Sequence, residues 1–135
     1  MKKFATNILI RNNRLAIMEK NGLTVNYEIL SDSDYLIALK KKLLEEAQEV
    51  FEAETSQDLK VELIDVMEVL EHLIDFYAFD EKELRKIKED KQAKIGKFDK
   101  KIKTHSVEMP DNHEKFLITC LSQINIRKLN RYMFE

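Results

Sequence analysis

The chain has 135 residues, of which 44% are hydrophobic and 36% charged, and its net charge is -2. This length suits one ordinary domain with a hydrophobic core, and the nearly balanced charge gives no reason to expect a nucleic-acid polymer as a partner. The sequence contains only 2 glycines and 1 proline. Because tight β-turns use these residues, an all-β fold with many hairpins is disfavoured, and we expect an all-α fold.

Cysteine content and hydropathy indicate the compartment. The single cysteine, Cys120, excludes an intramolecular disulfide and a cysteine-based zinc cage, and it fits a cytoplasmic protein. The apolar stretch behind the basic start contains Asn7 and stops at Arg11, which makes it too short for a secretory signal. The longest uncharged run, Phe116 to Ile126, is shorter than the roughly 18 residues of a membrane span. We therefore expect no membrane partner.

Capping signals divide the first part of the chain. Residues 7–21 predict a short helix that ends at Gly22, and residues 24–30 alternate loosely, as expected of an extended connector. Ser31 begins a pattern that resembles a capping box, and the helix behind it is predicted to continue to about residue 54.

Two further helices are predicted in the middle of the chain. Ser56 is positioned to cap a helix over residues 58–79. Asp80 and Glu83 form another capping-box start, and the helix that they begin is predicted to end near Gly96.

The domain organisation follows from these elements. We expect a helical domain over residues 1–103, of which residues 97–103 are basic and irregular, and a C-terminal extension over residues 104–135. The extension contains Pro110, which suits a helix start, and one weak helical pattern. We expect it to be helical and to pack on the bundle or on a partner subunit.

Acidic and basic residues are segregated along the chain. The segment from Leu43 to Glu83 contains fourteen acidic residues and two basic ones, whereas the segment from Lys82 to Lys103 contains ten basic residues and four acidic ones. Such a pattern can hold a metal ion and a polyphosphate together. More often it reflects two solvated faces of opposite charge that attract each other.

One carboxylate of the first long helix falls among apolar residues. Glu46 has the following apolar neighbours three, four or seven residues away: Leu39, Leu43, Val50 and Ala53. Glu49 is beside it on the same face. A lone carboxylate in an apolar stripe is costly unless it is paired, protonated or bound to a cation.

The next helix repeats this pattern. Glu62 and Asp65 are three residues apart and share a face, and Glu62 is bordered by Leu59, Val66 and Val69. The rest of the helix is apolar around most of its circumference. This composition predicts burial on more than one side, against its own bundle and against a second subunit.

The two carboxylate pairs are expected to converge, because a short connection makes the two helices antiparallel. Two unit charges 4 Å apart repel by about 4 kcal/mol at an effective dielectric of 20, so four acids in a partly apolar pocket require a cation. Oxygen ligands favour Mg²⁺, with Mn²⁺ as a substitute. In the alternative all four carboxylates are solvated, at a cost of roughly a few tenths of a kcal/mol per pair. Glu49 fits that alternative, and Glu46 does not.

The arrangement Glu45-Glu46-x-x-Glu49, twelve residues and then Glu62-x-x-Asp65 resembles the signature of the MazG-like nucleoside triphosphate pyrophosphohydrolases. These enzymes belong to the all-α NTP pyrophosphatase superfamily, with the phosphoribosyl-ATP pyrophosphohydrolases. The resemblance extends from about residue 7 to residue 102 and includes the segment Gly96-Lys97-Phe98-Asp99-Lys100-Lys101-Ile102. It implies an antiparallel helical bundle of that type, completed by oligomerisation to a homodimer or homotetramer.

The resemblance also implies a reaction and its residues. The family hydrolyses a nucleotide between the α and β phosphates, which releases a nucleoside monophosphate and pyrophosphate. The implied Mg²⁺ ligands are Glu46, Glu49, Glu62 and Asp65. Glu45 is implied as an auxiliary catalytic residue, and either it or Glu49 orients the attacking water. The implied triphosphate-binding residues are Lys91, Lys94, Lys97, Lys100 and Lys101.

The start of the chain departs from the family pattern. Small members usually read Leu-Val-Arg-Asp-Lys-Ile-Pro, whereas this chain reads Leu9-Ile10-Arg11-Asn12-Asn13-Arg14-Leu15. Arg11 is the residue of this segment that keeps the implied role in holding the nucleotide. The altered segment and the extension over residues 104–135 motivate an alternative, a non-catalytic helical interaction or regulatory module derived from the same family.

Overall fold

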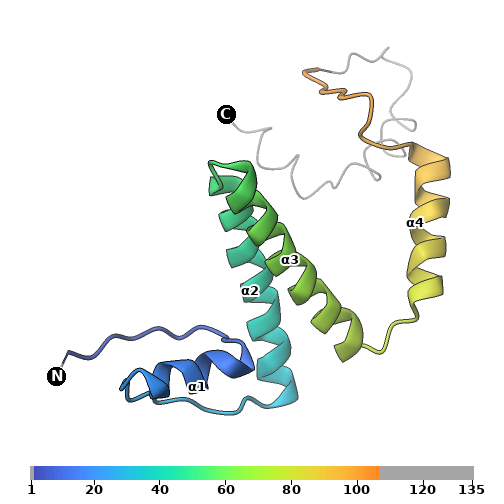
Figure 1. Ribbon diagram of the computed structural model, residues 1–135. Helices are drawn as coiled ribbons and strands as arrows, with labels where there is room; N and C mark the ends of the chain where they lie inside the picture. The colour runs from blue at the N-terminus through green and yellow to red at the C-terminus, as the bar shows by residue number, and fades with distance from the viewer. Residues whose placement is uncertain (1, 107–135) are drawn as a thin grey trace. The chain divides into compact units, whose positions relative to one another are not determined.

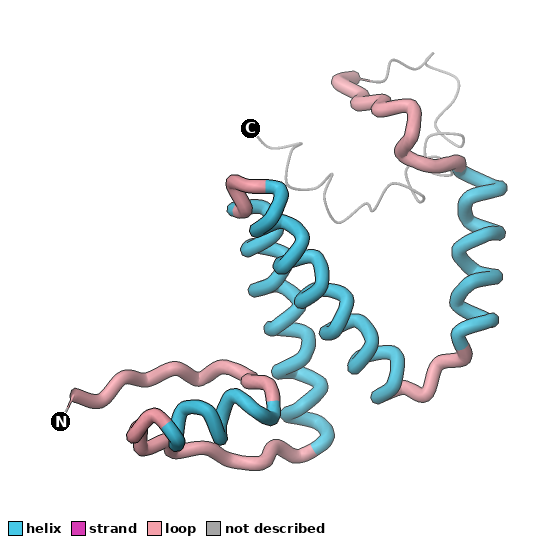
Figure 2. Tube along the Cα trace, in the orientation of Figure 1, coloured by secondary structure: helices cyan, strands magenta, loops and turns pink. Residues whose placement is uncertain are grey.

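The structure is a computed structural model that describes residues 2–106, and within this range all regular secondary structure is helical (Figure 2). The helices, in chain order, are α1 (Asn12–Lys20), α2 (Asp32–Glu52), α3 (Ser56–Phe76) and α4 (Glu81–Ile95). The prediction of an all-α fold is confirmed. The predicted helical extension falls largely on residues 107–135, which lie outside the described residues.

The chain divides into two compact units, Met1–Lys91 and Gln92–Glu135. The first unit contains α1, α2, α3 and most of α4, and the second begins in the last turns of α4. The candidate site described below lies wholly in the first unit. None of the helices in the described part of the chain combines the length and the apolar composition of a membrane span.

The two long helices begin at capping boxes. Ser31 is the N-cap of α2, because its hydroxyl accepts a hydrogen bond from the Asp34 N–H at 3.2 Å and donates one to Asp34 Oδ2 at 2.7 Å. Thr55, not Ser56, is the N-cap of α3, so the predicted cap is wrong. Thr55 lies three residues before Asp58 and exchanges with it the same two hydrogen bonds, at 3.1 and 2.6 Å.

The two shorter helices are bounded by local conformation. Helix α1 is shorter than predicted and begins at Asn12, because its N-cap, Arg11, has an extended backbone with a φ of -67° and a ψ of 147°. Its end is followed by Gly22 at a φ of 79°, as the sequence predicts. Helix α4 begins where predicted, with the Glu83 N–H donating to Asp80 Oδ1 at 2.9 Å, and it ends before Gly96, whose φ is 81°.

Helices α2 and α3 pack side by side and antiparallel, joined by the short connection over residues 53–55 (Figure 1). Leu39 of α2 and Val69 of α3 are buried in this contact, and they are the only apolar side chains with full burial among residues 2–106. The predicted antiparallel pairing is confirmed, and it brings the carboxylates of both helices to the end near the connection.

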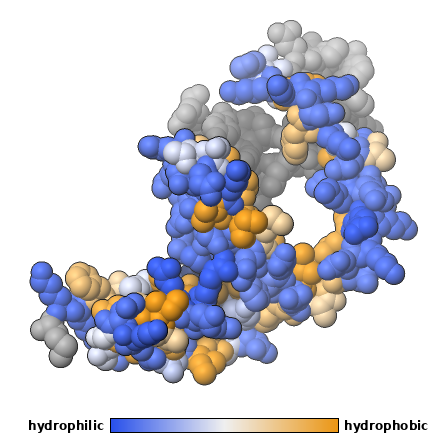
Figure 3. Space-filling model, viewed as in Figure 1, coloured by the Kyte–Doolittle hydropathy of each residue, from blue (hydrophilic) through white to orange (hydrophobic). Residues whose placement is uncertain are grey.

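Much of the apolar surface of this helix pair is exposed within the described chain. Apolar residues reach the surface between hydrophilic ones (Figure 3). On α3 the exposed stripe consists of Leu59, Leu63, Met67 and Leu70, spaced four, four and three residues apart. On α2 it consists of Ile37, Leu44 and Phe51, spaced seven residues apart. These spacings place each set on one face of its helix.

The two candidate caps of α3 give a direct stability test. Thr55→Ala removes the side-chain acceptor of the Asp58 N–H, so we expect a loss of about 1 kcal/mol in the free energy of unfolding. Ser56→Ala changes an exposed first-turn residue without a capping role and should leave stability unchanged within about 0.5 kcal/mol. Chemical denaturation of both variants measures the difference, and equal losses would contradict the assignment of Thr55 as the cap.

Candidate metal centre

Glu46 is the buried carboxylate that the sequence predicts. Only 4% of the residue is exposed, between α2 and α3. Its Oε1 lies 2.6 Å from Lys42 Nζ in an ion pair, whereas its Oε2 is buried and has no hydrogen-bond partner within the described chain. A buried oxygen that lacks a partner costs about 1–3 kcal/mol, and more when it carries charge, so this atom is suited to an additional cation.

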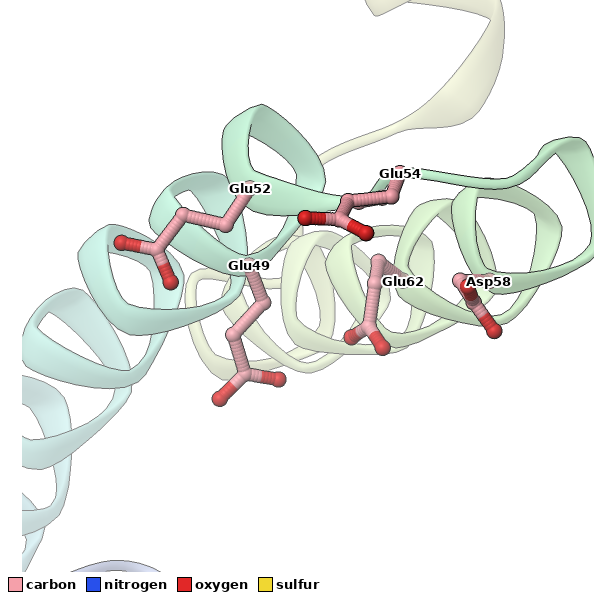
Figure 4. A pocket seen from close by; sticks show the side chains of 6 residues that line it. Glu49, Glu52, Glu54, Asp58 and Glu62 are labelled. Atoms are coloured by element: carbon pink, nitrogen blue, oxygen red, sulfur yellow. The ribbon is translucent and has the colours of Figure 1, made fainter.

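Three glutamates converge at this point. One carboxylate oxygen from each of Glu46, Glu49 and Glu62 lies within 4.8 Å of the other two. Glu46 and Glu49 come from successive turns of α2, and Glu62 comes from α3 at the matching height. Glu49 and Glu62 extend their carboxylates to the same side of the helix pair (Figure 4). The structure therefore brings together three of the four predicted metal ligands.

The carboxylates of this cluster are close enough to repel one another. Partial burial, followed by the hydrogen bond to Glu62 and the repulsion from it, raises the pKa of Glu49 above its ordinary value. A raised carboxyl pKa means that the folded chain disfavours the ionised form, and this cost is present at pH values above the raised pKa. A bound cation removes the same cost without protonation.

Lys42 is the counterion that the chain itself supplies. Its Nζ lies 2.6 Å from Glu46 Oε1 and 2.8 Å from Glu45 Oε1. Burial lowers the pKa of Lys42, but the hydrogen bonds to Glu45 and Glu46 outweigh burial and leave the pKa above its ordinary value. Lys42 is therefore charged, and one ammonium group neutralises only part of the charge of the neighbouring carboxylates.

Asp65, the fourth predicted ligand, has a different partner. Its Oδ1 accepts a hydrogen bond from Arg11 Nη2, and Arg11 Nη1 lies 2.9 Å from Glu68 Oε2. Glu68, and then Asp65, hold the pKa of Arg11 above its ordinary value. Arg11, the predicted phosphate-binding residue of the N-terminal segment, lies between two carboxylates of α3.

The remaining predicted residues lie outside the three-glutamate cluster. Glu45, a predicted catalytic residue, is half-buried and is held by Lys42. The five predicted phosphate-binding lysines are exposed and form no ion pair with another residue of the range 2–106. Lys91 ends the first compact unit, and the other four belong to the second: Lys94, Lys97, Lys100 and Lys101.

An open depression of about 370 Å³ adjoins the cluster at the end of the helix pair (Figure 4). Its lining consists of Glu49, Glu52, Ala53, Glu54, Asp58 and Glu62. Two of these carboxylates already have partners, because Glu52 accepts from Gln48 Nε2 and Asp58 accepts from Thr55 Oγ1, each at 2.6 Å. Glu49 and Glu62 are the members of this lining that also belong to the cluster with Glu46.

Sequence reasoning missed two residues of this region. Lys42 precedes Glu46 by four residues, and this helical spacing could have identified the pair. Glu68 follows Asp65 by three residues, but nothing local indicates that both carboxylates would share Arg11, which is 54 residues from Asp65 in the sequence. That contact depends on the tertiary packing of the segment before α1 against α3.

The donor set fits a hard divalent cation. The three converging groups are carboxylates, with no nitrogen or sulfur donor among them, and such sites favour Mg²⁺ or Mn²⁺ over Zn²⁺. Comparison of the sequence with protein-family models and with curated proteins, and of the structure with solved structures, finds no match.

The pair of Lys42 and Glu46 gives a second stability test. In the absence of divalent ions, Lys42→Met leaves the buried Glu46 carboxylate without its partner, so we expect a loss of about 1–3 kcal/mol in the free energy of unfolding. The double variant Lys42→Met/Glu46→Leu should recover most of this loss, because apolar residues commonly replace a buried ion pair at little cost.

Lys41→Met is the matched control, since Lys41 is exposed and forms no ion pair within the described chain. Urea denaturation in a chelating buffer measures all three variants. A double variant that is less stable than Lys42→Met would show that the two residues stabilise the fold by some means other than their pairing.

Proposed function

We propose that the protein is a Mg²⁺-dependent hydrolase that cleaves a nucleoside triphosphate, or a related nucleotide, between the α and β phosphates. The observation that carries this proposal is the buried Oε2 of Glu46, which has no hydrogen-bond partner among residues 2–106 and lies beside the carboxylates of Glu49 and Glu62. A helical pair without a ligand-binding role has no need of a charge in this position, since an apolar residue would pack there at lower cost. The MazG-like motif is the basis for the reaction and for the substrate class.

The proposed site residues have separate roles. Glu46, Glu49 and Glu62 hold the cation, and Asp65 completes the set when it is released from Arg11. Bound Mg²⁺ supplies neutralisation of phosphate charge and a lowered pKa for a coordinated water. Glu49 is exposed to solvent, so it is better placed than Glu45 to orient the attacking water, because Glu45 is occupied by Lys42.

The proposed reaction is a hydrolysis at the α phosphorus. The water oxygen forms a bond to this phosphorus, the bond from it to the bridging oxygen of the β phosphate breaks, and pyrophosphate leaves. The proton of the water passes to Glu49. The basic residues from Lys91 to Lys101 are proposed to offset the charge of the leaving group, as positively charged side chains do in phosphoryl transfer.

A nucleotide panel tests the reaction. With Mg²⁺ present, we expect pyrophosphate release from at least one nucleoside triphosphate and none in a chelating buffer. Because even outer-shell partners of a metal contribute 10- to 100-fold, Glu46→Gln should lower the rate by roughly 100-fold or more. Glu71→Gln is the matched control, because Glu71 is an exposed carboxylate of α3 outside the cluster.

Two results would contradict the proposed reaction: release of no product from any nucleotide, or equal rates for Glu46→Gln and the unmodified chain. In that case the exposed apolar stripes favour the second candidate function, a non-catalytic helical interaction or regulatory module. A rise in melting temperature with Mg²⁺ separates a regulator that binds metal from a purely structural module, since binding to the folded state stabilises it.

We also propose that a second copy of the chain covers the apolar stripes of α2 and α3. Two side chains with full burial are a small core for the described range, and two antiparallel helix pairs combine readily into a four-helix bundle. Isologous contact between identical surfaces is the commonest way to form such a bundle, and it gives a homodimer or, by repetition, a homotetramer.

The mass in solution tests this assembly. At micromolar concentration we expect a dimer or tetramer, and Met67→Glu should shift the mass towards the monomer because it places a charge in the α3 stripe. Val61→Glu introduces the same charge at an exposed apolar position outside that stripe and should leave the mass unchanged. A monomeric mass for the unmodified chain would contradict the proposal.

A further inference from the structure

Arg11 forms an ion pair with Asp65, the carboxylate that is adjacent to Glu62 of the three-glutamate cluster on α3. Asp65 follows Glu62 by three residues on α3, so their side chains are neighbours on one face of the helix. Asp65 is half-buried, whereas Arg11 is more than half exposed. The guanidinium donates to Asp65 Oδ1 and, through its other terminal nitrogen, contacts Glu68 Oε2 at 2.9 Å.

This ion pair has two consequences for a cation at the cluster. It neutralises Asp65, which removes a negative charge that would otherwise attract a divalent ion to this face of α3. It also places a positive charge about one helical turn from Glu62, where like charges repel. The cluster itself points to a cation, since Glu46 is buried to 96% and its Oε2 lacks a partner within the described chain.

We infer that Arg11 is an intramolecular competitor of the divalent cation, and that loading of the metal centre releases Arg11 from Asp65. Arg11 is thus a positioning residue: in the metal-free chain it holds the segment before α1 against α3, and in the loaded chain its guanidinium is free to bind an anion. This inference rests on the proposed metal centre. Beyond that centre, we infer that Asp65 exchanges Arg11 for the cation, so that binding of the cation releases the N-terminal segment from α3.

The same exchange of partners would make the Arg11 guanidinium available to a phosphate group. A guanidinium binds carboxylates and phosphates through the same two-pronged pattern of donors, so a phosphate oxygen pair can replace Asp65 and Glu68. A ligand that carries both a divalent ion and phosphates satisfies both sides of the exchange at once. The cation and the phosphates are therefore expected to bind with positive coupling, whereas the cation alone has to displace Arg11 without compensation.

Titration with Mn²⁺ alone, followed by calorimetry, tests the competition. Arg11→Gln keeps polar character but removes the charge, and we expect it to lower the dissociation constant for Mn²⁺ by at least about threefold. Arg11→Lys keeps the charge and should bind Mn²⁺ much as the unmodified chain does. Arg14→Gln is the matched control, because Arg14 is exposed and forms no ion pair within residues 2–106.

A second measurement needs no variant that could disturb folding. The Nη–Hη resonances of Arg11 in the unmodified chain report the contacts of its two terminal nitrogens with Asp65 and Glu68, and saturating Mg²⁺ should shift them towards the position of a solvated arginine. A resonance that stays in place when Mg²⁺ saturates the protein would overturn the inference.

The outcomes separate this inference from the proposed function. If the unmodified chain binds Mn²⁺ and Arg11→Gln binds it equally or more weakly, the competition is refuted while the metal centre stands. If neither protein binds Mn²⁺, the metal centre and the competition are refuted together. Tighter binding by Arg11→Gln, with Arg14→Gln unchanged, supports the exchange.

Discussion

The buried carboxylate of Glu46 is the constraint on which the rest of this site depends. Its position between α2 and α3 takes it out of water, and burial of a charge is tolerated only where other charges or hydrogen bonds compensate for the lost hydration. Lys42 compensates one oxygen, and the other has no hydrogen-bond partner in the part of the chain that the structure describes. The nearby carboxylates of Glu49 and Glu62 add further negative charge, which makes the burial of the Glu46 carboxylate still less favourable.

The charge of the site is therefore divided between two internal cations. Lys42 serves the α2 carboxylates, and Arg11 serves those of α3. Glu46 shares Lys42 with Glu45, and Glu49 and Glu62 form no ion pair within the described chain, so the three converging glutamates have a deficit of positive charge. This deficit supports the proposed binding of a cation at the cluster.

The sequence predicts the helices well because their ends are decided locally. Asp34 and Asp80 participate in caps that the sequence identifies, whereas at α3 two neighbouring hydroxyl residues compete and the prediction names the wrong one. Thr55 is the cap because the Asp58 carboxylate, three residues later, accepts a hydrogen bond from its hydroxyl. The residue three positions after Ser56 is the apolar Leu59, which offers no such acceptor. The burial of Glu46 is also predictable, since it follows from the periodicity of the apolar residues around it.

The ion pair between Asp65 and Arg11 could not be predicted from local sequence spacing. Arg11 reaches it through the tertiary placement of a segment far away in the chain, and no local spacing encodes that contact. Helical periodicity places Asp65 on the same face as Glu62, and the sequence analysis therefore groups it with the other predicted ligands. Periodicity gives no information about which distant residues pack on that face. The exposed apolar stripe of α3 has the same origin, because periodicity indicates that a surface is apolar but not which element covers it.

The separation of four residues between Lys42 and Glu46 has a consequence for the order of events during folding. Both residues belong to a single helix, so the ammonium group and the carboxylate meet as soon as that turn of α2 forms, before α3 arrives. Helical turns form on a timescale of about a microsecond or less, which is faster than the docking of one helix on another. The charge that is later enclosed is thus already partly neutralised, and the nascent hairpin need not wait for an ion from the surroundings in order to close.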